Sequence, residues 1–544
     1  MGNAILTTHE RSSRKRRGSG IVVAIVVAVA ALLVRTGGAT PGTGTSDAVA
    51  AAGTDTVRIL LGAASTLDPA AQGDIGSAAI SAQLFESVTA FDPQLQVRPA
   101  LAASWDLLDG GRRIVFHLRP NLVFSDGSAL TSKDVVRSWL RILDPAHPSP
   151  LLSLMANVEG ALAYAHGQNA DPASVGLSAN GGDVEVRLTR PATDFVAIVA
   201  SPTFAIVPPG IDAGPAALTP AGFVGSGAYV LSADSGTTTT LTANDHYWAG
   251  PPPIRTVELV NDIGGRSPVA AFEAGDVDLT PIASFDAPWI SYDPTLGPQL
   301  REDSSLSLNY YGFDTSRPPF DDVRVRQAFA RAVDWRRLVS LVAGDTAAVA
   351  TSMVPPRVPG RSATDFLPAY DPDGARSLLA AAGYPGGAGF PETTMRTFGT
   401  QFDAAVVAEI KRELGVSIAY ETMSGDYFGR LATDPPSIWS MGWVADYPAP
   451  NDFLGILLGT GSSNNYGRWT SAAFDGAVGD ALQTTDPAVA RAAYDRAETV
   501  VRDEAPVIPL SYDKEWKLSR DGLLGANGNG LGIIRMAGLA WAKK

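Results

Sequence analysis

The stretch that decides the fold runs from Pro99 to Trp139, PALAASWDLLDGGRRIVFHLRPNLVFSDGSALTSKDVVRSW. Its turn Asp109-Gly110-Gly111 precedes the alternating segment Arg112–Leu118, a pattern typical of one arm of a β-hairpin. Thr131 can then cap a helix by accepting a hydrogen bond from the amide of Asp134. The apolar face of that helix would consist of Val135, Trp139 and Leu140. A hairpin followed by a capped, amphipathic helix predicts strands and helices packed in one unit.

Outward from this stretch, strands and helices mix along the whole chain. We expect strands at Thr56–Gly62, Asp183–Leu188, Tyr229–Leu231 and Val507–Tyr512. We expect helices at Gly76–Val88, Val325–Val333, Val406–Leu414 and Ala488–Asp503, and another that starts at Asp371-Pro372. No short repeat is visible, and 544 residues allow about three domains. The sequence therefore predicts an α/β or α+β protein with several domains.

The composition is that of an ordinary globular protein. Of its residues, 45% are hydrophobic and 18% charged, which excludes wholesale disorder and a polytopic membrane protein. The net charge of −14 is unevenly spread, because residues 1–39 carry +5 and leave −19 for the rest. A body that acidic repels phosphates, so we expect no nucleic-acid partner.

The sequence favours neither catalysis nor a bound metal. It has no cysteine, which removes disulfides, zinc–thiolate sites and thiol catalysis, and its five histidines show no metal-ligand spacing. Ser511–Lys514 matches S-x-x-K, the acylation motif of penicillin-recognising enzymes. That motif needs a serine at a helix start and a K-T-G element, whereas Ser511 follows a predicted strand and K-T-G is absent. We expect a protein that is not an enzyme and has no cofactor.

The first residues predict export. A basic cluster, Arg11–Arg17, precedes the apolar run Ile21–Val34, which as a helix spans about 21 Å, less than the roughly 30 Å of a bilayer core. That length favours a secretory signal slightly over an uncleaved anchor, so residues 1–39 are a signal peptide or a membrane anchor. Residues 40–55 are expected to form a flexible tether. In both cases the body lies outside the cytoplasmic membrane, in the periplasm or cell envelope.

Six segments together resemble the family 5 extracellular solute-binding proteins, the peptide- and nickel-type receptors of ABC importers. The first is Pro99–Trp139, with its hairpin, F-S-D-G and following helix. The others, in family order, are Gly225–Tyr229 with Tyr247-Trp248, Phe272–Leu279, Asn309–Val333, Asp371–Pro385 and Gly442–Pro450. The resemblance extends over roughly residues 56–520.

This resemblance implies an α/β, two-lobed fold like that of the periplasmic binding proteins (type II, cluster C), with mixed sheets, a hinge and three subdomains. Residues 56–305 would form lobe 1 with two subdomains, residues 306–505 would form lobe 2, and residues 506–544 would return to lobe 1. Chain crossings near Ser305 and Ala505 would then form the hinge, which lets the lobes close around a ligand.

The resemblance also implies ligand-binding residues. In the peptide binders of the family, the aspartate of a W-x-x-D-Y element pairs with the free α-ammonium of the ligand. That position here is Asp446, and Trp443 would form a wall of the neighbouring pocket. Tyr310 and Tyr311 are further candidate wall residues. No arginine matches a family anchor for a peptide carboxylate, and the usual lipid-modified cysteine is absent.

The leading hypothesis is therefore an extracytoplasmic receptor that captures short peptides by hinge closure and delivers them to an ABC permease. Its contact with the cytoplasmic membrane would come from the N-terminal segment. The alternative is a non-transport cell-envelope protein of the same fold that binds a glycolipid or an envelope precursor. A serine hydrolase at Ser511 ranks third.

Overall fold

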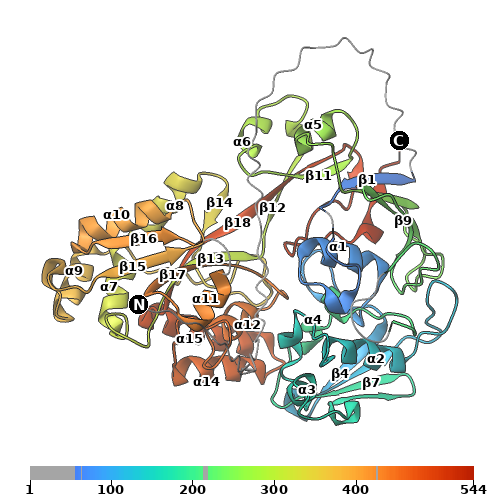
Figure 1. Ribbon diagram of the computed structural model, residues 1–544, viewed down its shortest axis with the longest axis horizontal. Helices are drawn as coiled ribbons and strands as arrows, with labels where there is room; N and C mark the ends of the chain where they lie inside the picture. The colour runs from blue at the N-terminus through green and yellow to red at the C-terminus, as the bar shows by residue number, and fades with distance from the viewer. Residues whose placement is uncertain (1–54, 63, 212–217, 424–426, 544) are drawn as a thin grey trace, which may run out of the picture.

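The computed structural model describes residues 55–543 except 63, 212–217 and 424–426 (Figure 1). The predicted signal or anchor segment, and the predicted tether up to residue 54, lie outside the described residues. Among the helices of the described part, none combines the length and apolarity needed to cross a bilayer. The described chain forms two α/β bodies, lobe 1 and lobe 2, which share a twelve-stranded mixed sheet.

Lobe 1 holds one end of this sheet. Strand β1 (Thr56–Leu60) lies between β10 (Thr256–Val260) and β11 (Leu279–Ile282) and is parallel to both. Strands β9 (Thr238–Ala243) and β8 (Tyr229–Asp234) continue the sheet in antiparallel order. The strands predicted near Thr56 and Tyr229 are therefore confirmed. The sheet is mixed because consecutive strands are joined here both by hairpins and by long crossovers.

A second subdomain of lobe 1 contains the stretch that opened the sequence analysis. Its antiparallel sheet has the order β4 (Ala102–Leu108), β5 (Arg113–Leu118), β7 (Asp183–Arg187) and β6 (Leu177–Asn180). The predicted hairpin is thus confirmed as β4–β5. Helix α2 (Ser132–Ile142) follows, and Thr131 donates its backbone N–H and its hydroxyl to the carboxylate of Asp134. The fully buried Trp139 of α2 packs edge-to-face on Phe116, Phe195 and Phe204.

Lobe 2 holds the other end of the large sheet. Its strand order is β16 (Ile418–Thr422), β15 (Thr393–Thr397), β17 (Ile438–Val444) and β13 (Ser307–Phe313). The four predicted helices of this region are present: α7 (Val323–Ala332), α9 (Pro372–Ala381), α10 (Asp403–Leu414) and α15 (Pro487–Glu504). Apolar residues of α7, α9 and α10 share one core on one side of β13, and those of α14 (Ala472–Leu482) and α15 share another core.

The two lobes are joined by one long strand, β18 (Val507–Ser519), which Figure 1 shows running from one body into the other. Its first part pairs with β13 and with β14 (Ala347–Val349) of lobe 2. Its second part pairs with β12 (Leu300–Ser304) and with β11 of lobe 1. The strand predicted at Val507–Tyr512 is therefore confirmed, and it is longer than predicted.

The crossing points of the chain lie side by side in this region. The backbone N–H of Ser305 donates to the carbonyl of Asp513 at 3.2 Å, and the N–H of Asp513 donates to Oγ of Ser307 at 3.0 Å. We infer that lobe 2 spans residues 306–513 and that the chain returns to lobe 1 inside β18, beyond the expected crossing near Ala505. The sequence does not mark this point, because an uninterrupted strand contains no turn signal where it passes from one lobe to the other.

Candidate ligand-binding site

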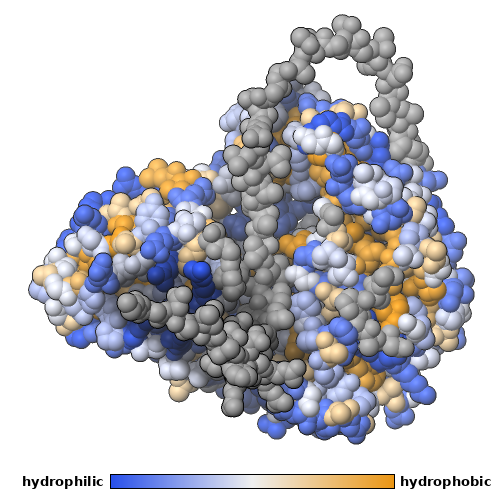
Figure 2. All heavy atoms as spheres, viewed as in Figure 1, coloured by the Kyte–Doolittle hydropathy of each residue, from blue (hydrophilic) through white to orange (hydrophobic). Residues whose placement is uncertain are grey.

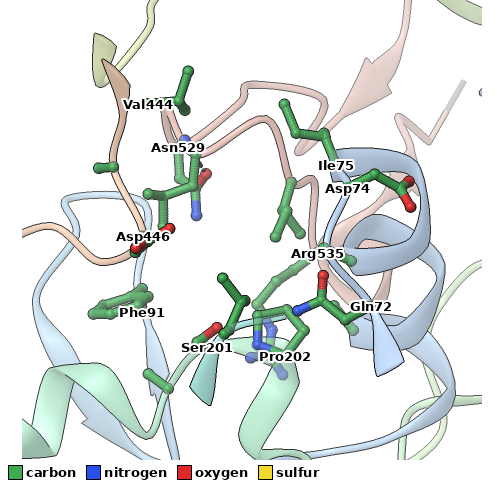
Figure 3. Close-up of a pocket in the computed structure, with 17 residues that line it drawn as sticks. Gln72, Asp74, Ile75, Phe91, Ser201, Pro202, Val444, Asp446, Asn529 and Arg535 are labelled. Atoms are coloured by element: carbon green, nitrogen blue, oxygen red, sulfur yellow. Dashed lines mark hydrogen bonds between the residues drawn. The ribbon is translucent and has the colours of Figure 1, made fainter. Parts of the chain in front are cut away.

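A pocket with about 810 Å³ of empty space, including its opening to solvent, lies between the lobes. Figure 2 shows a hollow between the two bodies, and Figure 3 shows the side chains that line the pocket. One wall comes from lobe 1, one from the chain that follows β17 in lobe 2, and one from the segment that follows β18.

Most of the lining is apolar, with a few polar groups among it. The apolar residues are Ile75, Ala78, Ala82, Phe91, Leu151, Ala200, Pro202, Val444, Ala445, Leu531 and Ile533. The polar residues are Gln72, Asp74, Ser201, Asp446, Asn529 and Arg535. Such a lining suits an organic ligand with an apolar body and one or two charged groups.

Asp446, the predicted ammonium-binding residue, lies in the wall of this pocket, two residues after the end of β17 (Figure 3). Its backbone N–H donates to Oδ2 of Asp452 at 3.3 Å. Among the described residues, no side chain or backbone group donates a hydrogen bond to its carboxylate. Burial raises the pKa of Asp446 to about 7, because a charged carboxylate loses its hydration there. Among the described residues, Asp446 thus has no cation hydrogen-bonded to its carboxylate.

Trp443 is buried on β17 and does not occur among the described residues that line the pocket. Its Nε1–H donates to Oδ2 of Asp452 at 2.9 Å, and its side chain belongs to the same core as α14 and α15. Since the same carboxylate oxygen accepts from Asp446 N–H, Trp443 is linked to the pocket through Asp452. Trp443 therefore lies behind the pocket wall, whereas the sequence predicts that it forms part of the wall.

Tyr310 and Tyr311, the other predicted wall residues, are also absent from the described lining and are 1% and 2% exposed. They are neighbours on β13, so their side chains enter the cores on opposite faces of the sheet. Tyr311 donates its hydroxyl to Asp403 at 2.7 Å, and Tyr310 packs edge-to-face on Trp439. Both faces of this strand are covered, which explains why two adjacent aromatic residues are buried.

Arg535 is a polar wall residue that the sequence did not reveal. Its Nη2 donates to Oε2 of Glu86 at 2.7 Å and to the hydroxyl of Tyr247 at 3.3 Å. The Glu86 carboxylate also accepts from the Tyr247 hydroxyl, and it holds the pKa of Arg535 above the usual value. Tyr247 lies in one of the segments quoted for the family resemblance, but nothing in the sequence shows its partner 288 residues further on.

The glycine-rich stretch Gly525–Gly532 places this C-terminal wall on the hinge. Gly530 has a φ of +87°, and a Cβ there would lie 2.8 Å from the carbonyl oxygen of Ser304. The N–H of Leu306 donates to the Gly530 carbonyl at 2.8 Å. Glycine is therefore required for the close approach to the crossing strand. Nothing in the sequence indicates that Asn529 lines a pocket.

Ser511 does not have the surroundings of an acylated serine. It is fully buried within β18, where residues three apart point to opposite faces of the strand. Lys514 instead forms an ion pair with Glu302 at 3.0 Å. Within the described chain, no group of three or more His, Asp or Glu side chains is arranged to hold a metal ion.

Two lobes joined by adjacent strands, with a pocket between them, define a class of hinged solute receptor. The family model of the bacterial extracellular solute-binding proteins, family 5, matches residues 96–465, so the chain belongs to this family. The resemblance seen in the sequence is confirmed, and so are the expected fold class and the role of an extracytoplasmic solute-binding protein.

The chain is similar to individual relatives over most of its length. The probable deoxycholate-binding periplasmic protein YgiS of Escherichia coli is 34% identical over 482 residues, which cover 83% of this chain and 87% of YgiS. The periplasmic oligopeptide-binding protein OppA of Salmonella typhimurium is 28% identical over 477 residues, 82% of this chain and 85% of OppA. The solved structure of the murein tripeptide-binding protein MppA in its unliganded open form shares the fold, with a TM-score of 0.78, 24% identity and coverage of 91% and 98% of the two chains.

Proposed function

We propose that this solute-binding protein captures short peptides in the pocket between its lobes and delivers them to an ABC permease. The observation that carries the proposal is Asp446, a carboxylate in the pocket wall with no protein cation beside it. A peptide brings an α-ammonium group, which can pair with this carboxylate and donate hydrogen bonds to it. The relatives OppA and MppA bear names that state peptide binding.

Contacts across the lobes suggest how capture works. Tyr447 of lobe 2 donates its hydroxyl to Asp194 of lobe 1 at 2.8 Å, and Asn451 donates its amide to the same carboxylate at 3.1 Å. A ligand that touches both Asp446 and the lobe 1 wall adds to these contacts. It therefore stabilises the arrangement in which the lobes meet, as hinge closure requires.

The function consists of reversible binding without chemistry, since the buried Ser511 has neither the position nor the lysine partner of an acylation site. Delivery requires that the protein stay near the permease. The N-terminal segment with Ile21–Val34 would provide that contact with the cytoplasmic membrane if it is retained.

The apolar lining and Arg535 favour a second candidate ligand, an amphipathic carboxylic acid of the kind named for YgiS. Such a molecule would place its acid group near Arg535 and its rings against the apolar walls. It carries no cation, so its binding would not depend on the charge of Asp446.

Native mass spectrometry of the purified protein incubated with a mixture of dipeptides to pentapeptides, and separately with deoxycholate, tests the proposal. We expect peptide adducts of a preferred length in the wild type. The Asp446→Ala variant should bind the selected peptide at least thirtyfold more weakly by calorimetry. Asp446→Asn serves as a control of equal size. Adducts of deoxycholate alone, unaffected by either variant, would replace the peptide assignment by the second candidate.

A further inference from the structure

Asp452 is a buried carboxylate that touches the binding residues from behind. It lies in α12 (Pro450–Phe453) and is 0% exposed. Its Oδ2 accepts the Nε1–H of Trp443 at 2.9 Å and the backbone N–H of Asp446 at 3.3 Å. Its Oδ1 is buried and has no hydrogen-bond partner among the described residues. A carboxylate that is charged and fully buried needs a cation or several donors, and this one has two donors on one oxygen.

The groups that face Asp452 are acidic or neutral. Asp446 lies on the chain that follows β17, and Asp194 directly precedes α4 (Phe195–Ile198) on the other lobe. Tyr447 contacts Asp194, and Tyr494 of α15 lies within electrostatic reach of it. Among the described residues, the cation that acts on these groups is Arg190, which offsets part of the rise that burial causes in the pKa of Asp194 and donates its Nε–H to Asn157.

These surroundings disfavour a second negative charge. Two carboxylates that lie close together in a buried site do not both ionise near neutral pH. Burial and the charge of Asp446 raise the pKa of Asp452 well above its ordinary value, whereas the pKa of Asp446 is raised by burial alone. Asp446 faces the pocket, whereas Asp452 is 0% exposed and one of its oxygens has no partner among the described residues, so the negative charge is favoured on Asp446 and Asp452 keeps its proton.

We propose that Asp452 is a neutral carboxylic acid that positions Trp443 and the backbone of Asp446, so that the pocket presents a single negative charge to its ligand. The inference rests on the proposed function, because the single charge at Asp446 is what selects one ammonium group. A dication would gain only one partner at this site. Asp452 is thus a positioning residue that also limits the charge of the accepted ligand.

The first test needs no ligand. We would measure the thermal midpoint of the wild type, Asp452→Asn and Asp452→Leu from pH 5 to pH 8.5. Asparagine copies the shape and the accepting oxygen of the neutral acid but does not titrate, whereas a neutral Asp452 keeps in the folded state a proton that the unfolded state releases. Asp452→Asn should therefore become progressively more stable than the wild type as the pH rises. If the difference between the two is independent of pH, Asp452 is ionised in the folded state as it is in the unfolded state, and the proposal is overturned. Asp452→Leu should be less stable than Asp452→Asn at every pH.

The second test uses the tripeptide Ala-Ala-Ala and calorimetry at pH 8. We expect Asp452→Asn to bind within threefold of the wild type and Asp452→Leu to bind at least tenfold more weakly, because only asparagine can hold Trp443 and Asp446. Equal weakening in both variants would show that the charge of Asp452 is needed, and wild-type affinity in Asp452→Leu would show that no positioning is needed. If the wild type fails to bind peptides, the proposed function is refuted, while the stability test still decides the state of Asp452.

Discussion

The pocket has two charged ends that the protein treats differently. Arg535, in the C-terminal wall, is held by the buried Glu86, whose side chain is 4% exposed. Asp446, in the lobe 2 wall, has no basic partner among the described residues. A charge with an internal partner belongs to the scaffold, because the pair is complete before a ligand arrives. A charge without such a partner can be paired only by a group on the ligand. This difference is why our functional proposal rests on Asp446.

The largest effect on stability should come from breaking the ion pair between Arg535 and Glu86. Arg535→Gln would leave Glu86 buried without its cation, and we expect the free energy of unfolding to fall by about 3 kcal/mol. Chemical denaturation of the variant measures this loss. The double variant Glu86→Gln/Arg535→Gln is the matched control and should regain part of the stability. If the single and double variants lose the same amount, the pair is not what stabilises this wall.

A chemical change to the ligand should show the contribution of Asp446, the charged residue without a protein partner among the described residues. N-acetylation removes the ammonium charge of a bound peptide, so the wild type should bind the acetylated form about 2 kcal/mol more weakly, roughly thirtyfold. Asp446→Asn should bind both forms with similar affinity, since the variant has no carboxylate with which the ammonium of the free peptide could pair. Calorimetry with one peptide in both forms measures the four affinities. Equal discrimination by wild type and variant would place the ammonium elsewhere.

The pH dependence of stability should show what the unpaired carboxylate costs the free protein. Because burial raises the pKa of Asp446 to about 7 from an ordinary 3.8, the folded state binds a proton that the unfolded state has released. Stability should therefore fall as the pH rises from about 4 to about 7. Asp446→Asn lacks this ionisation. The full shift corresponds to about 4 kcal/mol, but Asp446 is only half-buried and solvent screens part of its charge, so the variant should exceed the wild type by about 1–2 kcal/mol at pH 8 and by little at pH 4. A constant difference across that range would contradict the raised pKa.

The smallest effect concerns the polar contact between the lobes. Tyr447→Phe removes the hydrogen bond to Asp194 and leaves that from Asn451, so we expect ligand affinity to fall by about 1 kcal/mol, roughly fivefold. Tyr512→Phe is the control, because the Tyr512 hydroxyl donates to the Ser352 carbonyl within lobe 2. The same loss of affinity in both variants would mean that the contact between the lobes has no special role.

Local features of the fold could be predicted because their causes lie close together in the sequence. The turn before β5, the cap at Thr131 and the helices with apolar spacing depend on neighbours a few residues away. The position of Asp446 in the pocket wall agrees with a motif of four residues that starts at Trp443. Such short-range patterns are visible in one chain without any knowledge of its folded shape.

The features that could not be predicted from the sequence depend on contacts between distant segments. Arg535 meets Glu86 across 449 positions of sequence, and no periodicity signals such a pair. Tyr310 and Tyr311 resemble exposed binding aromatics until both faces of β13 are known to be covered. The crossing that we infer inside β18 has no local signal for the same reason, since the sequence of a strand does not show which lobe its neighbours belong to.

The late position of β18 in the chain has a consequence for folding during synthesis. This strand lies between β13 and β11, so the large sheet lacks a central member until residue 519 has been synthesised. The two halves of that sheet can be joined only when this last part of the chain is available. The pocket is therefore completed at the end of synthesis, since its wall residues Asn529 and Arg535 also lie beyond β18.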